Sequence, residues 1–135
     1  MIVVDSNIIA YCWIHGERTA LAHRLRKLDP DWHAPVLWRS ELRNILTGYR
    51  RDGSLGEDPA RQIMAAAESG LAGREHHLPS DRVFAVTERS PLSTYDAEFV
   101  ALAEILDVLL VTEDRVILAA WPSRASTLKG ALEIQ

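Results

Sequence analysis

Hydrophobic positions along the chain alternate between short aliphatic runs and longer stretches in which they recur at helical spacing. The runs predict strands at residues 1–5, 32–34, 75–78, 108–111 and 125–128. Helices predicted between them cover residues 6–14, 17–28, 36–51, 58–71, 80–89, 95–106 and 115–120. This alternation is typical of βα units, so we predict an α/β fold with a central, mostly parallel sheet.

Turn residues separate these segments and set their ends. Asp29-Pro30-Asp31 and Asp52-Gly53 break the helical pattern, and Ser90-Pro91 ends another predicted helix. Ser80, and either Ser93 or Thr94, are predicted N-caps because their hydroxyls can accept a hydrogen bond from the first helical turn. No linker, repeat or low-complexity stretch interrupts the pattern. We therefore expect residues 1–135 to form a single domain.

Carboxylates follow two of the predicted strands. Asp5 ends the first strand in Asp5-Ser6-Asn7, and Asp114 follows the buried run at 108–111 in Thr112-Glu113-Asp114. In open α/β sheets, ligands bind at the carboxyl ends of the strands. If these two strands are neighbours, Asp5 and Asp114 face one another there.

Each of these carboxylates also has a purely structural interpretation. Asp5 and Asp114 are well placed to cap the helices that follow them. Asp96 lies three residues after Ser93, where it favours the helix dipole and can complete a capping box. An α/β module with no catalytic role, whose carboxylates only cap helices, is therefore an alternative.

Glu41 is harder to explain by capping. In the predicted helix 36–51, apolar residues recur at the spacing of one helical face, and Glu41 falls between Leu37 and Ile45 at the edge of that face. A lone glutamate is awkward at the edge of an apolar stripe. A glutamate that points into a shared pocket is not, and this interpretation adds Glu41 to the three aspartates.

Bringing these carboxylates together requires a cation. Two unit charges about 4 Å apart repel by ~4 kcal/mol at an effective dielectric constant of about 20. Ligands that are all oxygen select a hard ion such as Mg²⁺ or Mn²⁺. The net charge is −4, with 19 acidic and 15 basic residues, so the acidic excess equals this proposed set of four. A bound cation would offset that excess, and the net charge does not exclude a nucleic-acid substrate.

Composition otherwise fits a globular protein. Apolar residues make up 47% of the chain and charged residues 25%, and no apolar run reaches the ~18 residues of a membrane span. The chain begins with strand-like residues rather than a signal sequence, and we expect it in the cytoplasm. Cys12 is expected to be a core thiol without a chemical role. The five histidines are expected at surface or capping positions: His15, His23, His33, His76 and His77.

Four segments together resemble the PIN-domain ribonucleases, particularly the VapC-type toxins of toxin–antitoxin pairs. They are Asp5-Ser6-Asn7 after a strand, Ser40-Glu41-Leu42 on a helix, Tyr95-Asp96-Ala97 with Leu102-Ala103-Glu104 on a later helix, and Leu110-Val111-Thr112-Glu113-Asp114 after a strand. The resemblance covers nearly the whole chain, in order and with similar spacing.

The resemblance implies a PIN-like three-layer α/β/α domain that cleaves RNA with Mg²⁺ or Mn²⁺ through a metal-activated water. It implies a catalytic, metal-binding set of Asp5, Glu41, Asp96 and Asp114, with Asn7 and Thr112 in supporting polar positions. It also implies a cognate antitoxin that covers the active-site groove, and we expect a homodimer.

One departure from the family concerns a second metal ion. Some members carry another acidic residue a few positions beyond the fourth, where this chain has Val116, Ile117 and Leu118. This argues against a tightly held second ion and leaves Glu113 as a partial substitute.

Residues that would contact RNA are less clear from the sequence. Arg115 is the candidate phosphate contact because it adjoins Asp114. Arg39, Arg43 and Arg50 share a helix face opposite Glu41 and are expected to be solvated or to contact a partner. The four tryptophans could stack on bases, but packing in the core or at an interface is expected, with one or two of them at a dimer or antitoxin interface: Trp13, Trp32, Trp38 and Trp121.

A second enzymatic alternative is a Mg²⁺-dependent phosphatase or phosphotransferase that uses Asp5 as its nucleophile. The haloacid-dehalogenase pattern, however, requires a second aspartate two residues on, where this chain has Asn7. A receiver-type domain would require a lysine at a late strand end, and neither Lys27 nor Lys129 fits.

Overall fold

The computed structural model describes residues 1–134, and within them five strands form one sheet in the order β3-β2-β1-β4-β5. The strands are β1 (Ile2–Val4), β2 (Trp32–Pro35), β3 (Glu75–His76), β4 (Leu110–Val111) and β5 (Ala125–Ser126). Each neighbouring pair is parallel, and Val3 of β1 pairs with His33 of β2 on one side and Leu110 of β4 on the other. The predicted α/β class and mostly parallel sheet are confirmed.

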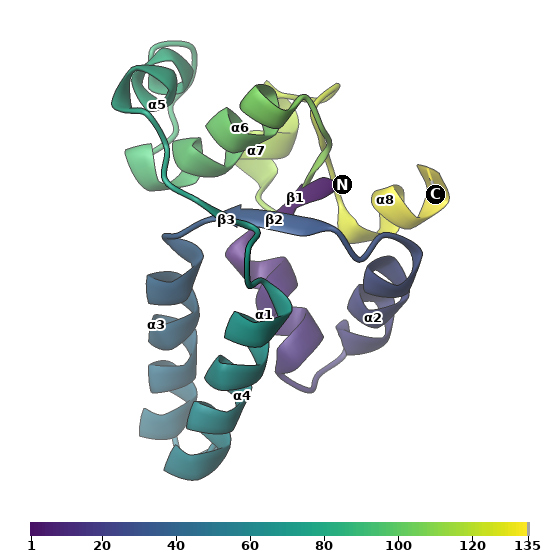
Figure 1. Cartoon of the computed structure of the whole chain (residues 1–135), viewed down its shortest axis with the longest axis vertical. Helices are drawn as coiled ribbons and strands as arrows, with labels where there is room; N and C mark the ends of the chain where they lie inside the picture. Colours follow the sequence, from purple (N-terminus) through teal and green to yellow (C-terminus); the bar gives the residue numbers. More distant parts are fainter. Residues whose placement is uncertain (135) are drawn as a thin grey trace.

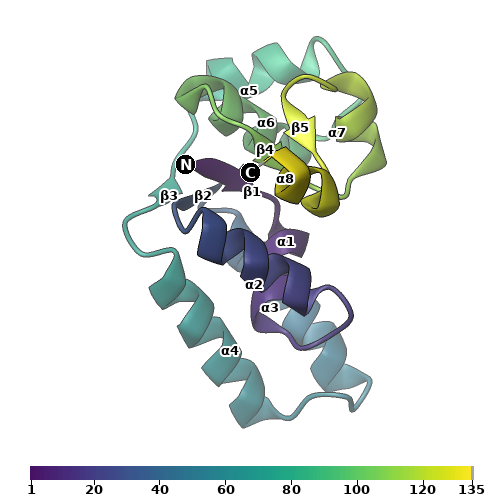
Figure 2. The same cartoon turned by 90° about the vertical axis from the view of Figure 1, so that its right-hand side faces the viewer.

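Helices cover both faces of this sheet (Figures 1 and 2). On one side lie α1 (Ser6–Trp13), α2 (Thr19–Leu28), α3 (Trp38–Arg51) and α4 (Glu57–Gly70). On the other lie α5 (Ser80–Thr87), α6 (Thr94–Leu106) and α7 (Arg115–Ala120), while α8 (Leu128–Ile134) packs against α2. The predicted three-layer α/β/α arrangement is confirmed. None of the described helices has the length and hydropathy needed to cross a membrane.

The core forms where α6 packs on the central strands. Val3 and Val4 of β1 are fully buried, as are Val100 and Ala101 of α6. Cys12 is buried as expected, and burial raises the pKa of its thiol to about 11, which keeps it protonated.

Two of the four tryptophans lie wholly inside the protein. Trp32 is 1% exposed and Trp38 is fully buried, so their packing within the chain is complete. Trp13 and Trp121 are partly exposed, and Trp13 packs edge-on against Trp32 with ring centroids 6.2 Å apart. Of the four tryptophans, therefore, only Trp13 and Trp121 are accessible enough to take part in the dimer or antitoxin interface that was predicted from the sequence.

Helix α8 differs from the prediction, which ended the chain with an extended segment at 125–128. Strand β5 stops at Ser126 because the next residues turn into a helix, and Thr127 Oγ1 accepts a hydrogen bond from the Gly130 N–H at 2.9 Å. The sequence did not predict α8 because the helix is short and contains a glycine, Gly130. Ser80 also differs, because it is the first residue of α5 and Pro79 holds the N-cap position.

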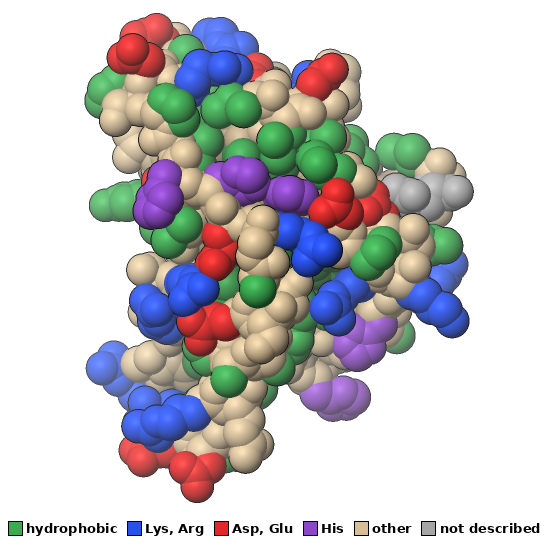
Figure 3. All heavy atoms as spheres, in the orientation of Figure 1, with side chains coloured by type: hydrophobic (Ala, Val, Ile, Leu, Met, Phe, Trp, Pro, Cys, Tyr) green, Lys and Arg blue, Asp and Glu red, His purple; other side chains and the backbone are tan. Residues whose placement is uncertain are grey.

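The histidines on the edge strands are not all at the surface. His33 is only 9% exposed, and its Nδ1 lies 2.8 Å from His76 Nε2 while its Nε2 lies 2.9 Å from Asp31 Oδ1. The expectation of a surface or capping role was wrong for His33. Figure 3, drawn in the orientation of Figure 1, shows histidine side chains gathered at the level of β2 and β3.

Candidate active site

The sheet order brings Asp5 and Asp114 to the same edge, because β1 and β4 are neighbours and both end there. The Asp5 N–H donates to the Val111 carbonyl oxygen at 3.0 Å, which fixes the end of β1 against the end of β4. A cavity of about 520 Å³ opens at this edge, lined by Asp5, Ser6, Asn7, Leu37, Ser40, Glu41, Asn44, Ile45, Ser93, Tyr95, Asp96 and Asp114. All of the predicted carboxylates line this one cavity, and so does the predicted supporting residue Asn7.

Thr112 holds the two strand-end aspartates in place. Its Oγ1 donates to Asp5 Oδ2 at 2.7 Å and accepts from the Asp114 N–H at 3.0 Å. Thr112 is fully buried and Asp5 is 9% exposed, so water does not compete for these bonds. The hydroxyl therefore fixes the distance between the two ends, which suits the supporting position predicted for Thr112.

Both strand-end aspartates also cap helices, as the alternative interpretation predicted. Asp5 Oδ1 accepts from the Ser6 N–H at 2.7 Å at the start of α1, and Asp114 Oδ1 accepts from the Ile117 N–H at 2.9 Å at the start of α7. A carboxylate has about four lone-pair sites, so a capping bond leaves capacity for another ligand. Capping and ligand binding are compatible at both positions.

Glu41 approaches the cavity from α3. The Ser6 Oγ donates to Glu41 Oε1 at 2.7 Å, and this bond joins the first turn of α1 to the first turn of α3. Ser6 is 4% exposed, which makes the bond part of the packed interface between the two helices. Glu41 thus points into the shared pocket that its place at the edge of the apolar stripe predicted.

The pKa shifts show that these carboxylates interact. Burial raises the pKa of Asp5, the hydrogen bonds from Thr112 and Ser6 oppose this shift, and the charges of Asp96 and Asp114 add to it. Burial likewise raises the pKa of Asp96, and the charge of Asp114 adds to that effect. Like charges in a partly buried site disfavour ionisation, so the cavity favours a cation or protons.

Glu41 belongs to the same electrostatic cluster. Burial raises its pKa, the Ser6 hydroxyl opposes the shift, and the charges of Asp5 and Asp96 raise it further. Glu98 contributes a smaller repulsion of the same sign.

The donor chemistry of the cavity fits a hard divalent cation, because its charged groups are all carboxylates. Across residues 1–134, however, no three Asp, Glu, His or Cys side chains lie close enough together to hold one ion. Carboxylates repel one another unless a cation lies between them. Mg²⁺ is usually held by one or two carboxylates with water completing its coordination shell, so fewer than three ligands from the chain are compatible with binding.

Two residues singled out beside Asp114 lie outside the cavity lining. Glu113 accepts a hydrogen bond from the Leu128 N–H at 3.1 Å and lies 3.8 Å from Arg18 Nη1, so it faces the starts of α8 and α2. Arg115 is exposed at the start of α7, and its contact with RNA stays a prediction.

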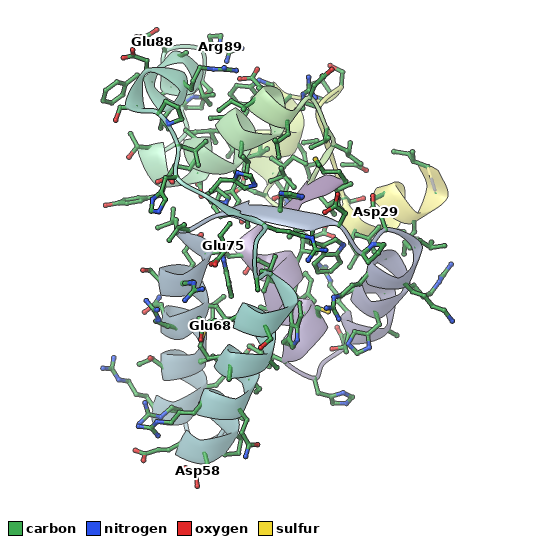
Figure 4. All side chains as sticks on the ribbon, viewed as in Figure 1. Asp29, Asp58, Glu68, Glu75, Glu88 and Arg89 are labelled. Carbon is green, nitrogen blue, oxygen red and sulfur yellow. The ribbon has the colours of Figure 1, made fainter. Side chains whose placement is uncertain are left out.

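Arg39 and Arg50 of α3 both bond to glutamates of this chain, Arg39 in a partly buried position and Arg50 at the surface. Arg39 Nε donates to Glu75 Oε1 at 2.6 Å, and Glu68 of α4 takes another of its N–H groups. Figure 4 labels both glutamates, which lie beneath the sheet beside α3 and α4. Arg50 Nη2 donates to Glu57 Oε1 at 2.8 Å. Arg43 and Arg50 are both exposed, as one of the two interpretations from the sequence expected, whereas Arg39 is only partly exposed.

Several polar residues of the cavity were not singled out from the sequence. Asn44 lies three residues after Glu41 on α3, a spacing that places two side chains on one helix face. Ser40 and Tyr95 are direct neighbours of predicted carboxylates. Helical spacing from Glu41 could have identified Asn44, whereas the bond from Ser6 to Glu41 depends on how α1 packs against α3.

Comparisons with known proteins support this arrangement. The chain is 29% identical to a protein named Ribonuclease VapC3 from Pyrobaculum aerophilum over 125 residues, which cover 90% of this chain and 95% of that protein. It is also 29% identical over 124 residues to proteins named Ribonuclease VapC3 from two Mycobacterium tuberculosis strains, covering 90% of this chain and 88% of each. No protein-family model matches the chain.

A solved structure shares the fold. The crystal structure of PAE2754 from Pyrobaculum aerophilum superposes with a TM-score of 0.78 at 23% identity, covering 98% of this chain and 94% of that one. The likeness therefore extends over the sheet and both helical layers. The PIN-like fold and the resemblance to VapC-type proteins are both confirmed.

Proposed function

We propose, from the confirmed resemblance to VapC-type PIN-domain ribonucleases, that this protein is a Mg²⁺- or Mn²⁺-dependent endoribonuclease and the toxin of a type II toxin–antitoxin system. The observation that carries the proposal is the single cavity at the carboxyl edge of the sheet, lined by Asp5, Glu41, Asp96 and Asp114. The relatives named as ribonucleases align over 90% of the chain that forms it.

The four carboxylates are the proposed metal ligands and catalytic set. A divalent ion bound there would supply an activated water and stabilise the leaving oxygen of a phosphodiester. Thr112 would keep Asp5 and Asp114 at a fixed separation, and Ser6 would hold Glu41 toward them. Asn7 would supply an amide at the rim, where it is exposed.

Asp5 is poorly disposed to act as a phosphoryl-accepting nucleophile. Both of its carboxylate oxygens accept hydrogen bonds, from the Ser6 N–H and from the Thr112 hydroxyl, and the residue is 9% exposed. These bonds hold the carboxylate as a fixed acceptor. They favour a ligand role over the phosphotransferase alternative.

The proposal includes the setting in which the enzyme acts. Residues 1–135 would act as a single PIN-like domain in the cytoplasm, as a homodimer, and a cognate antitoxin would cover the cavity. The partly exposed Trp13 and Trp121 are the tryptophans left to contribute to such interfaces.

Cleavage of RNA by the purified, partner-free protein tests this function. Total RNA with Mg²⁺ or Mn²⁺ should yield discrete fragments, and EDTA should abolish them. Asp96→Asn should lower the cleavage rate by more than about 100-fold, because it removes a proposed ligand. Asp81→Asn is the matched control, since Asp81 also lies in the first turn of a helix but on α5, outside the cavity, and it should cleave normally. A folded protein that leaves RNA intact with either metal would contradict the proposal.

A further inference from the structure

A second cavity adjoins the acidic one. It has a volume of about 430 Å³ and lies between α1 and α3, and it shares the lining residues Asn7 and Ile45 with the acidic cavity. Small-molecule sites in proteins commonly occupy roughly 300–1,000 Å³. We call this second cavity the α1–α3 groove.

The lining of the groove differs in chemistry from its acidic neighbour. Its wall is formed by Tyr11, Ile14 and Tyr49, and Tyr49 is 42% exposed. His15 and Arg18 also line it, whereas Glu17 is its one acidic residue. The groove thus joins aromatic faces to groups that can donate hydrogen bonds to a phosphate.

Arg18 is placed over Tyr11 but is not locked there. Its Nη1 donates to the Tyr11 hydroxyl at 3.2 Å, and its guanidinium carbon lies 5.3 Å from the Tyr11 ring centroid. The pair with Glu113 is long, at 3.8 Å, and the Arg18 side chain is 48% exposed. Exposed ion pairs are worth little, so Arg18 can exchange this partner for a phosphate at small cost.

The carboxylates of the acidic cavity do not attract RNA in the absence of a metal ion. They repel a polyanion, and the whole chain carries a net charge of −4. Groups other than these carboxylates must therefore hold the strand in position, and the neighbouring α1–α3 groove supplies both aromatic and basic ones. Aromatic side chains do this for single strands because every base has a face on which they can stack.

We propose that the α1–α3 groove binds one unpaired nucleotide of the RNA, next to the phosphate that lies at the acidic cavity. Tyr49 packs against the base, and His15 and Arg18 contact the flanking backbone. This inference rests on the proposed ribonuclease function and adds the substrate feature that the enzyme selects, an unstacked base.

Binding of RNA without cleavage tests the inference. Fluorescein-labelled single-stranded oligoribonucleotides of mixed sequence are titrated with protein in Ca²⁺ instead of Mg²⁺, and anisotropy gives the Kd. Tyr49→Ala should raise the Kd about fivefold or more, since base stacking on an aromatic residue contributes that much or more. Phe84→Ala is the matched control, because Phe84 is 53% exposed on α5 and lies outside both cavities, and its Kd should not change.

An oligoribonucleotide with abasic residues separates stacking from a general loss of structure. Tyr49→Ala and wild type should bind this RNA with similar Kd values, because no base remains to stack. Equal affinity of Tyr49→Ala and wild type for intact RNA, in a protein that cleaves RNA, would overturn the groove proposal alone. A wild-type protein that neither binds nor cleaves RNA would overturn the ribonuclease function as well.

Discussion

At the scale of single residues, one buried hydroxyl connects the two ends of the site. Thr112 bonds Asp5 and Asp114 at once, so a substitution there affects two proposed ligands without replacing either of them. The sequence identified the aspartates because strands that end on carboxylates are visible in it. The bond from Ser6 to Glu41 was not foreseen, since it joins residues 35 positions apart through helix packing.

Thr112→Val is predicted to lower both stability and metal affinity. The isosteric methyl group leaves the Asp114 N–H and Asp5 Oδ2 without their partner in a buried site, at a cost of about 1–3 kcal/mol in the free energy of unfolding. Metal affinity should fall by about 10–100-fold. Urea unfolding and Mn²⁺ titration measure the two effects, and Thr112→Ser should restore most of both. If Val and Ser variants behave alike, the hydroxyl has no positioning role.

Asp5→Asn is predicted to match or exceed the wild type in stability without divalent ions at neutral pH. Burial raises the pKa of Asp5, so the folded state binds its proton more tightly than the unfolded state does. The free energy of unfolding then falls as pH rises through and above the ordinary aspartate range near 4. Asparagine removes this cost and can still accept from the Ser6 N–H. Thermal melts in EDTA at pH 7 test this, and a clearly lower melting temperature for the variant would count against it.

At the scale of elements, α1 packs against α4 in the helical layer on one side of the sheet. The sequence predicted both helices from apolar spacing and turn residues, with ends within a residue or two of those observed. It did not predict which of them touch, because that depends on side chains far apart in the chain. Gly70, the last residue of α4, shows this, because a Cβ there would overlap the Trp13 ring at Cζ2.

Gly70→Ala is therefore predicted to destabilise the protein by about 1–3 kcal/mol, as overpacking does in a filled interior. Gly48→Ala is the matched control on α3, since a Cβ there meets no atom within 4 Å. It should stabilise the protein by about 0.5–1 kcal/mol through helix propensity alone. Urea unfolding of both variants gives the two free energies. If both substitutions changed the free energy of unfolding in the same direction, close packing of Trp13 against Gly70 would not explain the effect at Gly70.

At the scale of the whole molecule, the parallel sheet determines where chemistry can occur. The alternation of strands and helices predicted the sheet, and the strand-end aspartates predicted its functional edge. The same pattern gave no strand order, and neither the contact between the buried His33 and the partly exposed His76 nor the α1–α3 groove was predicted. Both depend on which strands and helices become neighbours, and the periodicity of a single segment carries no such information.

The histidine pair is predicted to make stability depend on pH near the edge of the sheet. Burial lowers the pKa of His76 and the neighbouring His33 lowers it further, so the unfolded state binds this proton more tightly. The free energy of unfolding should then fall as pH drops through about 6.5. His76→Gln should show a smaller fall between pH 7.5 and 5.5 in thermal melts. If wild type and His76→Gln show the same dependence of melting temperature on pH, the histidine pair does not control this pH dependence.

The proposed active site depends most on a single property, the capacity of the carboxylate-lined cavity to hold a divalent cation. Mn²⁺ titration of the metal-free protein at pH 7.5, followed by electron paramagnetic resonance, measures free and bound ion directly. We predict saturable binding that is lost or weakened at least about tenfold in Asp5→Asn and Asp114→Asn and unchanged in Asp81→Asn. Absence of saturable Mn²⁺ binding by the folded wild type, or equal binding by all of these variants, would contradict the proposed active site.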